Sequence, residues 1–210
     1  MSSLLSSAAN LLLGARCPLC QATAWGVCAQ CQARLKHQTP TAVSRPGIEL
    51  PIIAAHDYRP DIQRLVPRFK DDGALHLERF LAGRLAAALA SLSCGPSVIV
   101  VPIPSAPSSV RRRGVDHMRR LACVAAGLEN QRWAPLLIRL PRRRQQRGLD
   151  RSARQTNASG AMVARGTVTQ VVLVDDVVTS GASLREGHRA LKHAGVTVVG
   201  AAVIGHADRL

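Results

Sequence analysis

The chain has 210 residues, a formal net charge of +15 and a sequence pI near 11.3. This length allows one well-buried domain with a small appendage but not two full-sized cores, and the hydrophobic share of 47% excludes wholesale disorder. The excess charge is mostly arginine, which favours a polyanionic partner, while an aromatic content of only 2% excludes a row of stacking platforms for single-stranded nucleic acid.

No segment of the sequence is expected to enter a membrane. The N-terminal residues 1–14 lack a basic leader and have only a broken apolar stretch, so they make a poor signal peptide. Every long apolar run is interrupted by charge, Gly or Pro before it reaches the length of a bilayer. We therefore expect a cytoplasmic protein.

The first fifty residues are expected to form a small module ahead of the main domain. Residues 1–13 have the spacing of a short amphipathic helix, and residues 17–31 contain a cysteine cluster. Residues 38–51 are rich in Pro and Gly and are expected to be a linker. We place the domain boundary there, with residues 1–50 as the N-terminal module and residues 51–210 as the main domain.

Two C-x2-C motifs lie in this module, formed by Cys17 with Cys20 and by Cys28 with Cys31. Each motif can place two thiolates on one side of a tight turn, and four thiolates fill the tetrahedral shell of a structural zinc ion. Disulfides are the alternative, which a reducing cytoplasm disfavours, and a redox role is disfavoured because neither motif follows a strand. We expect a zinc site, with Trp25 either covering it or contacting a partner.

Strands and helices alternate along the main domain. Strands are expected at residues 52–55, 98–101, 136–140, 171–174 and 196–204, and helices at residues 61–69, 77–92, 118–128 and 182–194. The alternation predicts crossover connections and hence an α/β fold, a parallel sheet flanked by helices on both faces. In such sheets ligands bind beyond the carboxyl ends of the strands.

The apolar strand at residues 171–174 delivers Asp175 and Asp176 to such a carboxyl end. Residues 177–183 then turn into a helix, whose free amides and dipole favour a phosphate group. Hydroxyl donors and a glycine that permits close approach are supplied by Thr179, Ser180, Ser183 and Gly181. Two acids would repel a bare anion, but they suit a pair of ribose hydroxyls beside a phosphate. The segment predicts a pocket for a ribose 5-phosphate ester; the alternative is that these residues only cap a helix.

This segment resembles the phosphoribosyl pyrophosphate loop of type I phosphoribosyltransferases: an apolar strand, two acids, two variable residues, Thr-Thr/Ser and Gly. The resemblance implies a type I phosphoribosyltransferase-like fold in which Asp175 and Asp176 bind the ribose 2- and 3-hydroxyls. It implies that the 5-phosphate is held by the residues that follow, namely Val177, Val178, Thr179, Ser180, Gly181, Ala182 and Ser183. Magnesium would be bound mostly by substrate oxygens.

Two arginine-rich segments precede this loop. Residues 100–114 lead from a strand end to three arginines that are expected just before a helix start, where they can face a pyrophosphate, namely Arg111, Arg112 and Arg113. A second group lies in a polar stretch that is expected to be a mobile loop, and comprises Arg142, Arg143, Arg144, Arg147, Arg151 and Arg154. For individual arginines the alternative is a solvated face.

Together with the cysteines, these segments resemble the ComF family, also called the GntX or competence protein F family. The matching residues are Arg112, Arg113 and Gly114 of an Arg-Arg-Gly-Phe-Asn-Gln pattern, then Gln146, Leu149, Arg154 and Asn157, and Lys70 ahead of the long helix. Val115, Asp116 and His117 replace Phe-Asn-Gln. Asp116 is therefore expected to bring a negative charge towards the pyrophosphate site.

These resemblances leave three functions open. The first is a magnesium-dependent phosphoribosyltransferase, a pentosyl-transferring enzyme, in which Arg112, Arg113 and Lys70 stabilise the departing pyrophosphate and no residue identifies the acceptor. The second, implied by the ComF resemblance, is a non-catalytic factor that binds single-stranded DNA and acts with the competence machinery in DNA uptake. The third is a ligand-sensing regulator on the same fold.

Overall fold

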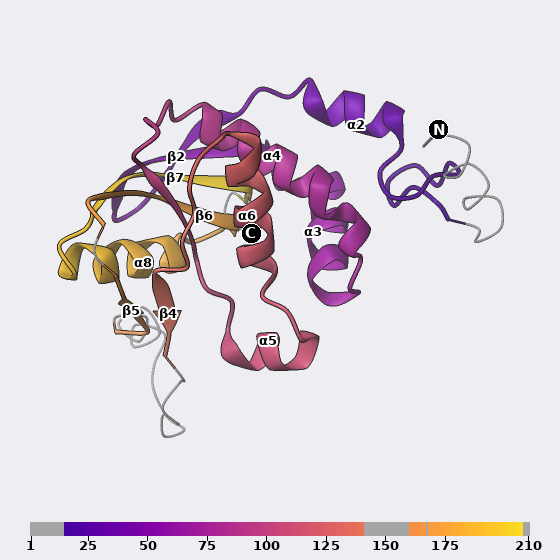
Figure 1. Cartoon of the computed structure of the whole chain (residues 1–210). Coiled ribbons are helices and arrows are strands. Elements are labelled where there is room, and N and C mark those ends of the chain that lie inside the picture. Colours follow the sequence, from indigo (N-terminus) through magenta and orange to yellow (C-terminus); the bar gives the residue numbers. More distant parts are fainter. Residues whose placement is uncertain (1–14, 141–159, 167, 208–210) are drawn as a thin grey trace.

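The structure is a computed structural model that describes residues 15–140, 160–166 and 168–207. Five strands form one sheet in the order β1-β2-β7-β6-β3 (Figure 1). These strands are β1 (Thr41–Arg45), β2 (Ile48–Asp57), β3 (Ile99–Pro102), β6 (Gln170–Val178) and β7 (Thr197–His206). β2, β7, β6 and β3 are parallel to their neighbours, and β1 pairs antiparallel with β2. The expected parallel sheet is confirmed, with one antiparallel edge strand added.

Helices cover both faces of this sheet. On one side lie α3 (Pro60–Asp71), α4 (Glu78–Ala90) and α6 (His117–Leu128), and on the other lies α8 (Ala182–His193). Because successive strand side chains point to opposite faces, Val172 and Val174 pack in the core with α4 and α6, whereas Val171 and Leu173 pack with α8. Burial on both faces explains the uninterrupted apolar run of β6.

Residues 38–51, expected to be a linker, instead contain β1 and the beginning of β2. The Pro and Gly residues that favoured a linker lie at a turn and at an irregularity of this edge pair, where proline and glycine are compatible with a sheet. Pro46 and Gly47 form the turn between the two strands, and Pro51 lies where the register of the β1–β2 pair shifts. The linker interpretation is therefore wrong, while the division of the chain into residues 1–50 and 51–210 stays a prediction.

A second, two-stranded antiparallel sheet packs against α8. It consists of β4 (Leu137–Arg139) and β5 (Met162–Ala164). The amide of Met162 donates a hydrogen bond of 2.8 Å to the buried carboxylate of Glu186 in α8, which fixes this sheet on the helix. The expected arginine loop and the family residues 146–157 lie between these strands and outside the described residues, as does the expected helix at residues 1–13.

Three short helices complete the described part of the chain. They are α2 (Ala29–Lys36), the 3-10 helix η1 (Leu75–Leu77) and α5 (Pro107–Arg113). α2 begins directly after Cys28 and contains Cys31, the last cysteine of the cluster, and α5 follows β3. Within the described ranges, none of the helices combines the length and apolar character that crossing a lipid bilayer requires.

Candidate functional site

Asp175 and Asp176 lie near the carboxyl end of β6, at the edge of the sheet where the parallel strands end. The strand continues beyond them, because Val177 and Val178 pair with β7. These two valines were expected to belong to the turn; that expectation is wrong, since β-branched residues favour a strand and Val178 is buried in the core. The turn is thus confined to residues 179–181, ahead of α8.

The two acids differ in their surroundings. Asp176 is only 6% exposed, forms an ion pair with Lys70 of α3, and accepts a 2.7 Å hydrogen bond from the amide of Val177. Asp175 accepts a 2.9 Å hydrogen bond from the amide of Asp176. Burial, reinforced by the charge of Asp176, raises the pKa of Asp175 to about 8. Lys70 thus neutralises Asp176, whereas Asp175 forms no ion pair with any described residue.

The residues expected on the pyrophosphate side come from two helices. Lys70 lies in the last turn of α3 and reaches Asp176. Arg113 is 17% exposed in its side chain and places Nη2 at 2.7 Å from Oδ1 of Asp71, the residue after Lys70. Arg112 is 71% exposed and lies 3.8 Å from the same carboxylate oxygen. The structure thus brings Lys70 to Asp176 and links Arg113 to the end of α3, while Arg112 remains at the surface.

The three arginines at positions 111–113 come shortly before the start of α6, as expected, but they lie in a short helix of their own. They form the last turn of α5, where positive charge is favourable to the helix dipole. Gly114, with φ of 74°, ends this helix in the left-handed conformation. A second helix, α6, begins only after Asp116.

Asp116 also has a different role from the one expected. Its carboxylate is the N-cap of α6 and accepts hydrogen bonds from the amides of Met118 at 3.1 Å and Arg119 at 3.4 Å. It also accepts a 2.9 Å hydrogen bond from the hydroxyl of Ser105. The negative charge is therefore engaged by a helix N-terminus, where it is stabilising.

His117, the first residue of α6, is a buried polar group beside this region. It is 2% exposed and packs edge-on against Phe69, with ring centroids 4.9 Å apart. Neither of its ring nitrogens has a hydrogen-bond partner among the described residues, and the same holds for Nε of Arg113. Burial, with the nearby charge of Arg113, lowers the pKa of His117. In the sequence, the only signal for this residue is its place in the family pattern.

The turn at residues 179–181 is held by two arginines that do not stand out in the sequence. Arg45, from the edge strand β1, donates from Nε to the carbonyl of Thr179 at 2.7 Å. Arg185, from the first turn of α8, donates from Nη1 to the carbonyl of Ser180 at 2.9 Å. Arg45 could not be found from the sequence because its segment has the composition of a linker.

The four thiols of Cys17, Cys20, Cys28 and Cys31 lie within 4.8 Å of one another. Sulfur ligands at 2.3 Å from a tetrahedral zinc ion are about 3.8 Å apart, so this cluster fits such an ion. Burial acts to raise the pKa of Cys17, but hydrogen bonds from the backbone of Cys28, Cys20 and Leu19 outweigh it and lower that pKa to about 6. Burial and the neighbouring thiols raise the pKa of Cys31 to about 12. The cluster could therefore bind zinc.

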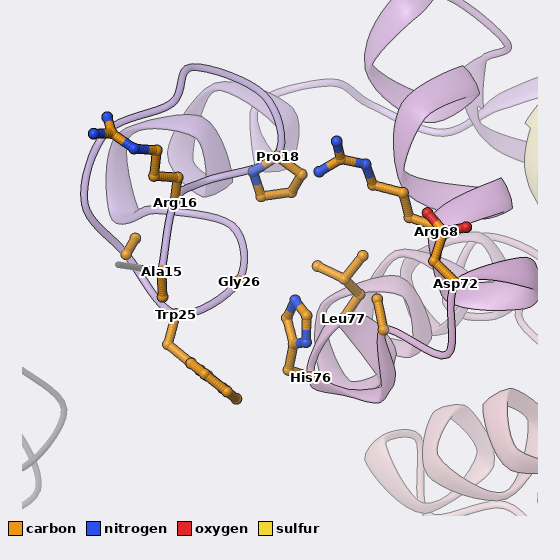
Figure 2. Close-up of a pocket in the computed structure, with 11 residues that line it drawn as sticks. Ala15, Arg16, Pro18, Trp25, Gly26, Arg68, Asp72, His76 and Leu77 are labelled. Carbon is orange, nitrogen blue, oxygen red and sulfur yellow. The ribbon is translucent and has the colours of Figure 1, made fainter. Parts of the chain in front are cut away.

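A separate pocket of about 260 Å³ lies between the cysteine module and the segment that joins α3 to η1. Figure 2 shows the rings of Trp25 and His76 side by side at this pocket, with Arg16 and Arg68 elsewhere on its rim. The two ring centroids are 5.3 Å apart, yet Trp25 remains 57% exposed. This pocket does not include Asp175, Asp176 or the turn at residues 179–181.

The family model described as "Phosphoribosyl transferase domain" matches residues 138–208. Over these residues the chain is similar to a phosphoribosyltransferase domain. The matched stretch includes both acids at the end of β6 and the turn that follows them. It does not include Lys70, Arg112 or Arg113, whose roles on the pyrophosphate side stay predictions.

Three solved structures similar to this chain are phosphoribosyltransferases. The first is orotate phosphoribosyltransferase from Aeropyrum pernix, which is 20% identical with a TM-score of 0.35, over 68% of this chain and 63% of that chain. The second is adenine phosphoribosyltransferase from Leishmania tarentolae, which is 16% identical with a TM-score of 0.36, over 85% of this chain and 86% of that chain. The third is adenine phosphoribosyltransferase from Leishmania donovani, which is 15% identical with a TM-score of 0.34, over 85% of this chain and 79% of that chain. The chain thus spans less than two thirds of the length of the orotate phosphoribosyltransferase. Among curated proteins no match was found. None of the matches described here names the ComF family, so that resemblance stays a prediction.

Proposed function

We propose that this chain binds phosphoribosyl pyrophosphate, or a related ribose 5-phosphate, at the carboxyl end of β6 and transfers phosphoribose to an acceptor that is still to be identified. The observation that carries the proposal is the pair Asp175 and Asp176 at a strand end, followed directly by a turn into α8, inside the stretch that the phosphoribosyltransferase model matches. Acids for ribose hydroxyls and free amides for a phosphate then lie next to each other along the chain.

In this proposal each part of the site has a defined task. Asp175 and Asp176 bind the 2- and 3-hydroxyls, and residues 179–183 bind the 5-phosphate through amides and hydroxyls. Magnesium, when bound mostly by substrate oxygens, would supply positive charge that neutralises the pyrophosphate and offsets the two acids. As the bond from ribose C1 to the pyrophosphate oxygen breaks, its electron pair leaves with pyrophosphate, whose charge Lys70 and Arg113 stabilise. A lone pair of the acceptor forms the new bond to C1, and the proton that the acceptor loses passes to solvent. Arg112, at the surface, adds charge at longer range.

The proposal is tested by calorimetric titration with phosphoribosyl pyrophosphate and magnesium. Replacing both acids, Asp175→Asn with Asp176→Asn, removes the charged acceptors for the ribose hydroxyls and is expected to lower the affinity by at least about tenfold. The matched control removes the same two charges elsewhere, with Glu49→Gln and Glu129→Gln, and is expected to bind like the unmodified protein. Absence of binding by the unmodified protein, or equal affinities for both double variants, would overturn the proposed site.

The transfer step needs a separate measurement. With phosphoribosyl pyrophosphate, magnesium and a panel of nucleobase and amine acceptors, we expect release of pyrophosphate that depends on one class of acceptor. Release that is equally absent in the unmodified protein and the double Asn variant, despite ligand binding, would point instead to a ligand-sensing regulator.

A second candidate function, binding of single-stranded DNA, is favoured by the net charge of +15 and by the exposed ring of Trp25 at a pocket that Arg16 and Arg68 also line. One exposed aromatic ring can stack on a base, and arginines on the rim of the same pocket can contact the phosphates. Binding of an oligonucleotide should then weaken steeply as salt is raised and should fall in Trp25→Ala but not in the double Asn variant. An affinity for the oligonucleotide that changes neither with salt concentration nor in Trp25→Ala would exclude this role.

We also propose that the four clustered cysteines hold a structural zinc ion. Metal analysis should then find one zinc per chain, and a chelator should lower the midpoint of thermal unfolding because the bound ion stabilises only the folded state. Cys28→Ser should lose the metal, whereas Cys123→Ser, which changes an exposed cysteine outside the cluster, should retain it. Stoichiometric zinc in Cys28→Ser would contradict the assignment.

A further inference from the structure

We infer that Arg45 and Arg185 are positioning residues for phosphate binding: they hold the carbonyl groups of the turn at residues 179–181 and so direct its amides to the 5-phosphate. The inference rests on the proposed function, because it concerns the same turn. It adds two residues from outside the recognised motif, one of them on the edge strand β1.

All three carbonyl groups of the turn are engaged. Those of Thr179 and Ser180 accept hydrogen bonds from Arg45 at 2.7 Å and from Arg185 at 2.9 Å. The carbonyl of Gly181 accepts from the backbone amide of Arg185, also at 2.9 Å, as the first hydrogen bond of α8. Three successive peptide groups are thus fixed by their oxygen atoms.

In a trans peptide the N–H group of one residue points opposite to the C=O group of the residue before it. The described residues contain no cis peptide bond, so the carbonyls of residues 179–181 fix the directions of the amides of Ser180, Gly181 and Ala182. These three amides donate no hydrogen bond to any group in the described part of the chain. They are therefore left available for an anion, as the N-terminus of α8 requires.

Both arginines are themselves anchored. Arg45 also donates to the carbonyls of Ser44 and Ala207, each at 2.8 Å, and contacts Nδ1 of His206 at 3.3 Å. It therefore joins β1, the end of β7 and the turn. Nη1 of Arg185 donates to the carbonyl of Pro46 at 2.8 Å as well as to the turn. The turn is held against the β1–β2 connection by groups that are already in place before a ligand binds.

Glycine at position 181 permits this close packing. Its φ is 74°, and a Cβ atom there would lie 2.5 Å from Cδ1 of Ile48 and 3.3 Å from Cβ of Arg45. The edge hairpin therefore contacts the turn directly, and a side chain at this position would push the turn away from Arg45. Gly181 and Arg45 therefore both contribute to the contact between the turn and the edge strand β1.

The test uses calorimetric titration with ribose 5-phosphate, which carries the phosphate but no pyrophosphate. Arg45→Met and Arg185→Met each remove a donor to one carbonyl of the turn, and each is expected to lower the affinity about five- to tenfold. Arg132→Met is the matched control, because it removes the same charge near the amino end of β3, at the opposite edge of the sheet. The control is expected to stay within about twofold of the unmodified protein, as for other exposed sites.

Arg45→Lys separates positioning from charge. Lysine keeps the positive charge, but an ammonium group cannot replace a guanidinium fork that joins three carbonyl groups. We expect Arg45→Lys to lose ribose 5-phosphate affinity as Arg45→Met does, and the amide resonances of Ser180 and Gly181 to respond less to inorganic phosphate. If Arg45→Lys bound ribose 5-phosphate as tightly as the unmodified protein does, the positioning role would be wrong, and Arg45 would act through its charge alone.

The outcomes distinguish this inference from the proposed function. If the unmodified protein binds and the double Asn variant does not, but the arginine variants match Arg132→Met, the positioning role is wrong and the proposed site stands. If the unmodified protein binds neither ribose 5-phosphate nor phosphoribosyl pyrophosphate, the proposed site itself fails. If Arg45→Met does not fold, Arg185→Met and Arg45→Lys still test the positioning role, because both keep a positive charge at position 45, where the side chain joins β1 to the end of β7.

Discussion

The two sides of the proposed site use their basic residues in different ways. On the phosphate side, Arg45 and Arg185 donate to neutral carbonyl groups and hold the backbone of the turn. On the pyrophosphate side, Lys70 and Arg113 are paired with carboxylates, those of Asp176 and Asp71. The phosphate side is therefore organised before a ligand arrives, whereas the pyrophosphate side must exchange internal partners for the ligand.

This difference has an energetic consequence. Amides that are already directed at an anion contribute to binding without a cost for reorganisation. A lysine that is paired with a largely buried acid must give up that partner, and the acid left behind is then costly unless a cation or a ligand hydroxyl replaces the lysine. Magnesium bound to the pyrophosphate would supply such positive charge. We therefore expect the ribose 5-phosphate part of the ligand to provide most of the affinity in the absence of magnesium.

The largest effect is expected on the phosphate side, from Gly181→Ala. Alanine in the left-handed conformation costs about 1–2 kcal/mol, and the collision with Ile48 adds about 1–3 kcal/mol of overpacking. Denaturant unfolding should show both losses, and ribose 5-phosphate affinity should fall because the turn moves away from Arg45. Gly195→Ala is the control: its φ of 75° is nearly the same, but no atom lies within 4 Å of the added Cβ, so it should show the conformational cost alone. Equal losses in the two variants would contradict a packed phosphate turn.

Much of the phosphate side could be predicted from the sequence because it is local. The strand of β6, the two acids, the turn and the start of α8 follow one another within residues 170–193, and apolar periodicity and glycine identify each of them. The exception is the end of β6. Val177 and Val178 match the variable positions of a loop motif, but their pairing with β7 makes them strand residues.

The rest of the site could not be predicted because it depends on contacts between distant segments. Arg45 reaches Thr179 across 134 positions of the chain, and nothing in the composition of residues 38–51 distinguishes an edge hairpin from a linker. The role of Asp116 could not be predicted from the sequence either, because an acid beside an arginine cluster can face a ligand or cap the next helix. Only the position at which α6 begins decides between these roles.

A smaller effect, specific to the pyrophosphate side, is expected from Lys70→Met. Asp176 is then left without its ion-pair partner in a largely buried place, which should lower the free energy of unfolding by about 1–3 kcal/mol. Affinity for phosphoribosyl pyrophosphate should fall more than affinity for ribose 5-phosphate, because only the former presents a pyrophosphate to Lys70. Lys192→Met, which removes an exposed lysine at the far end of α8, is the control. A loss that is equal for the two ligands would place Lys70 outside the pyrophosphate side.

The smallest effect is expected from Asp71→Asn, which releases Arg113 from its carboxylate partner. Asp71 is 51% exposed in its side chain, and an ion pair of this kind contributes at most about 1 kcal/mol, so stability should hardly change. Affinity for phosphoribosyl pyrophosphate should rise by about two- to fivefold at low salt and the gain should shrink as salt is added, because the interaction is screened. Asp72→Asn removes the neighbouring acid, which forms no ion pair with any described residue, and should give a smaller gain. If ribose 5-phosphate gained as much as phosphoribosyl pyrophosphate, Arg113 would act on the whole site through its charge, and the division into an organised phosphate side and an internally paired pyrophosphate side would not hold.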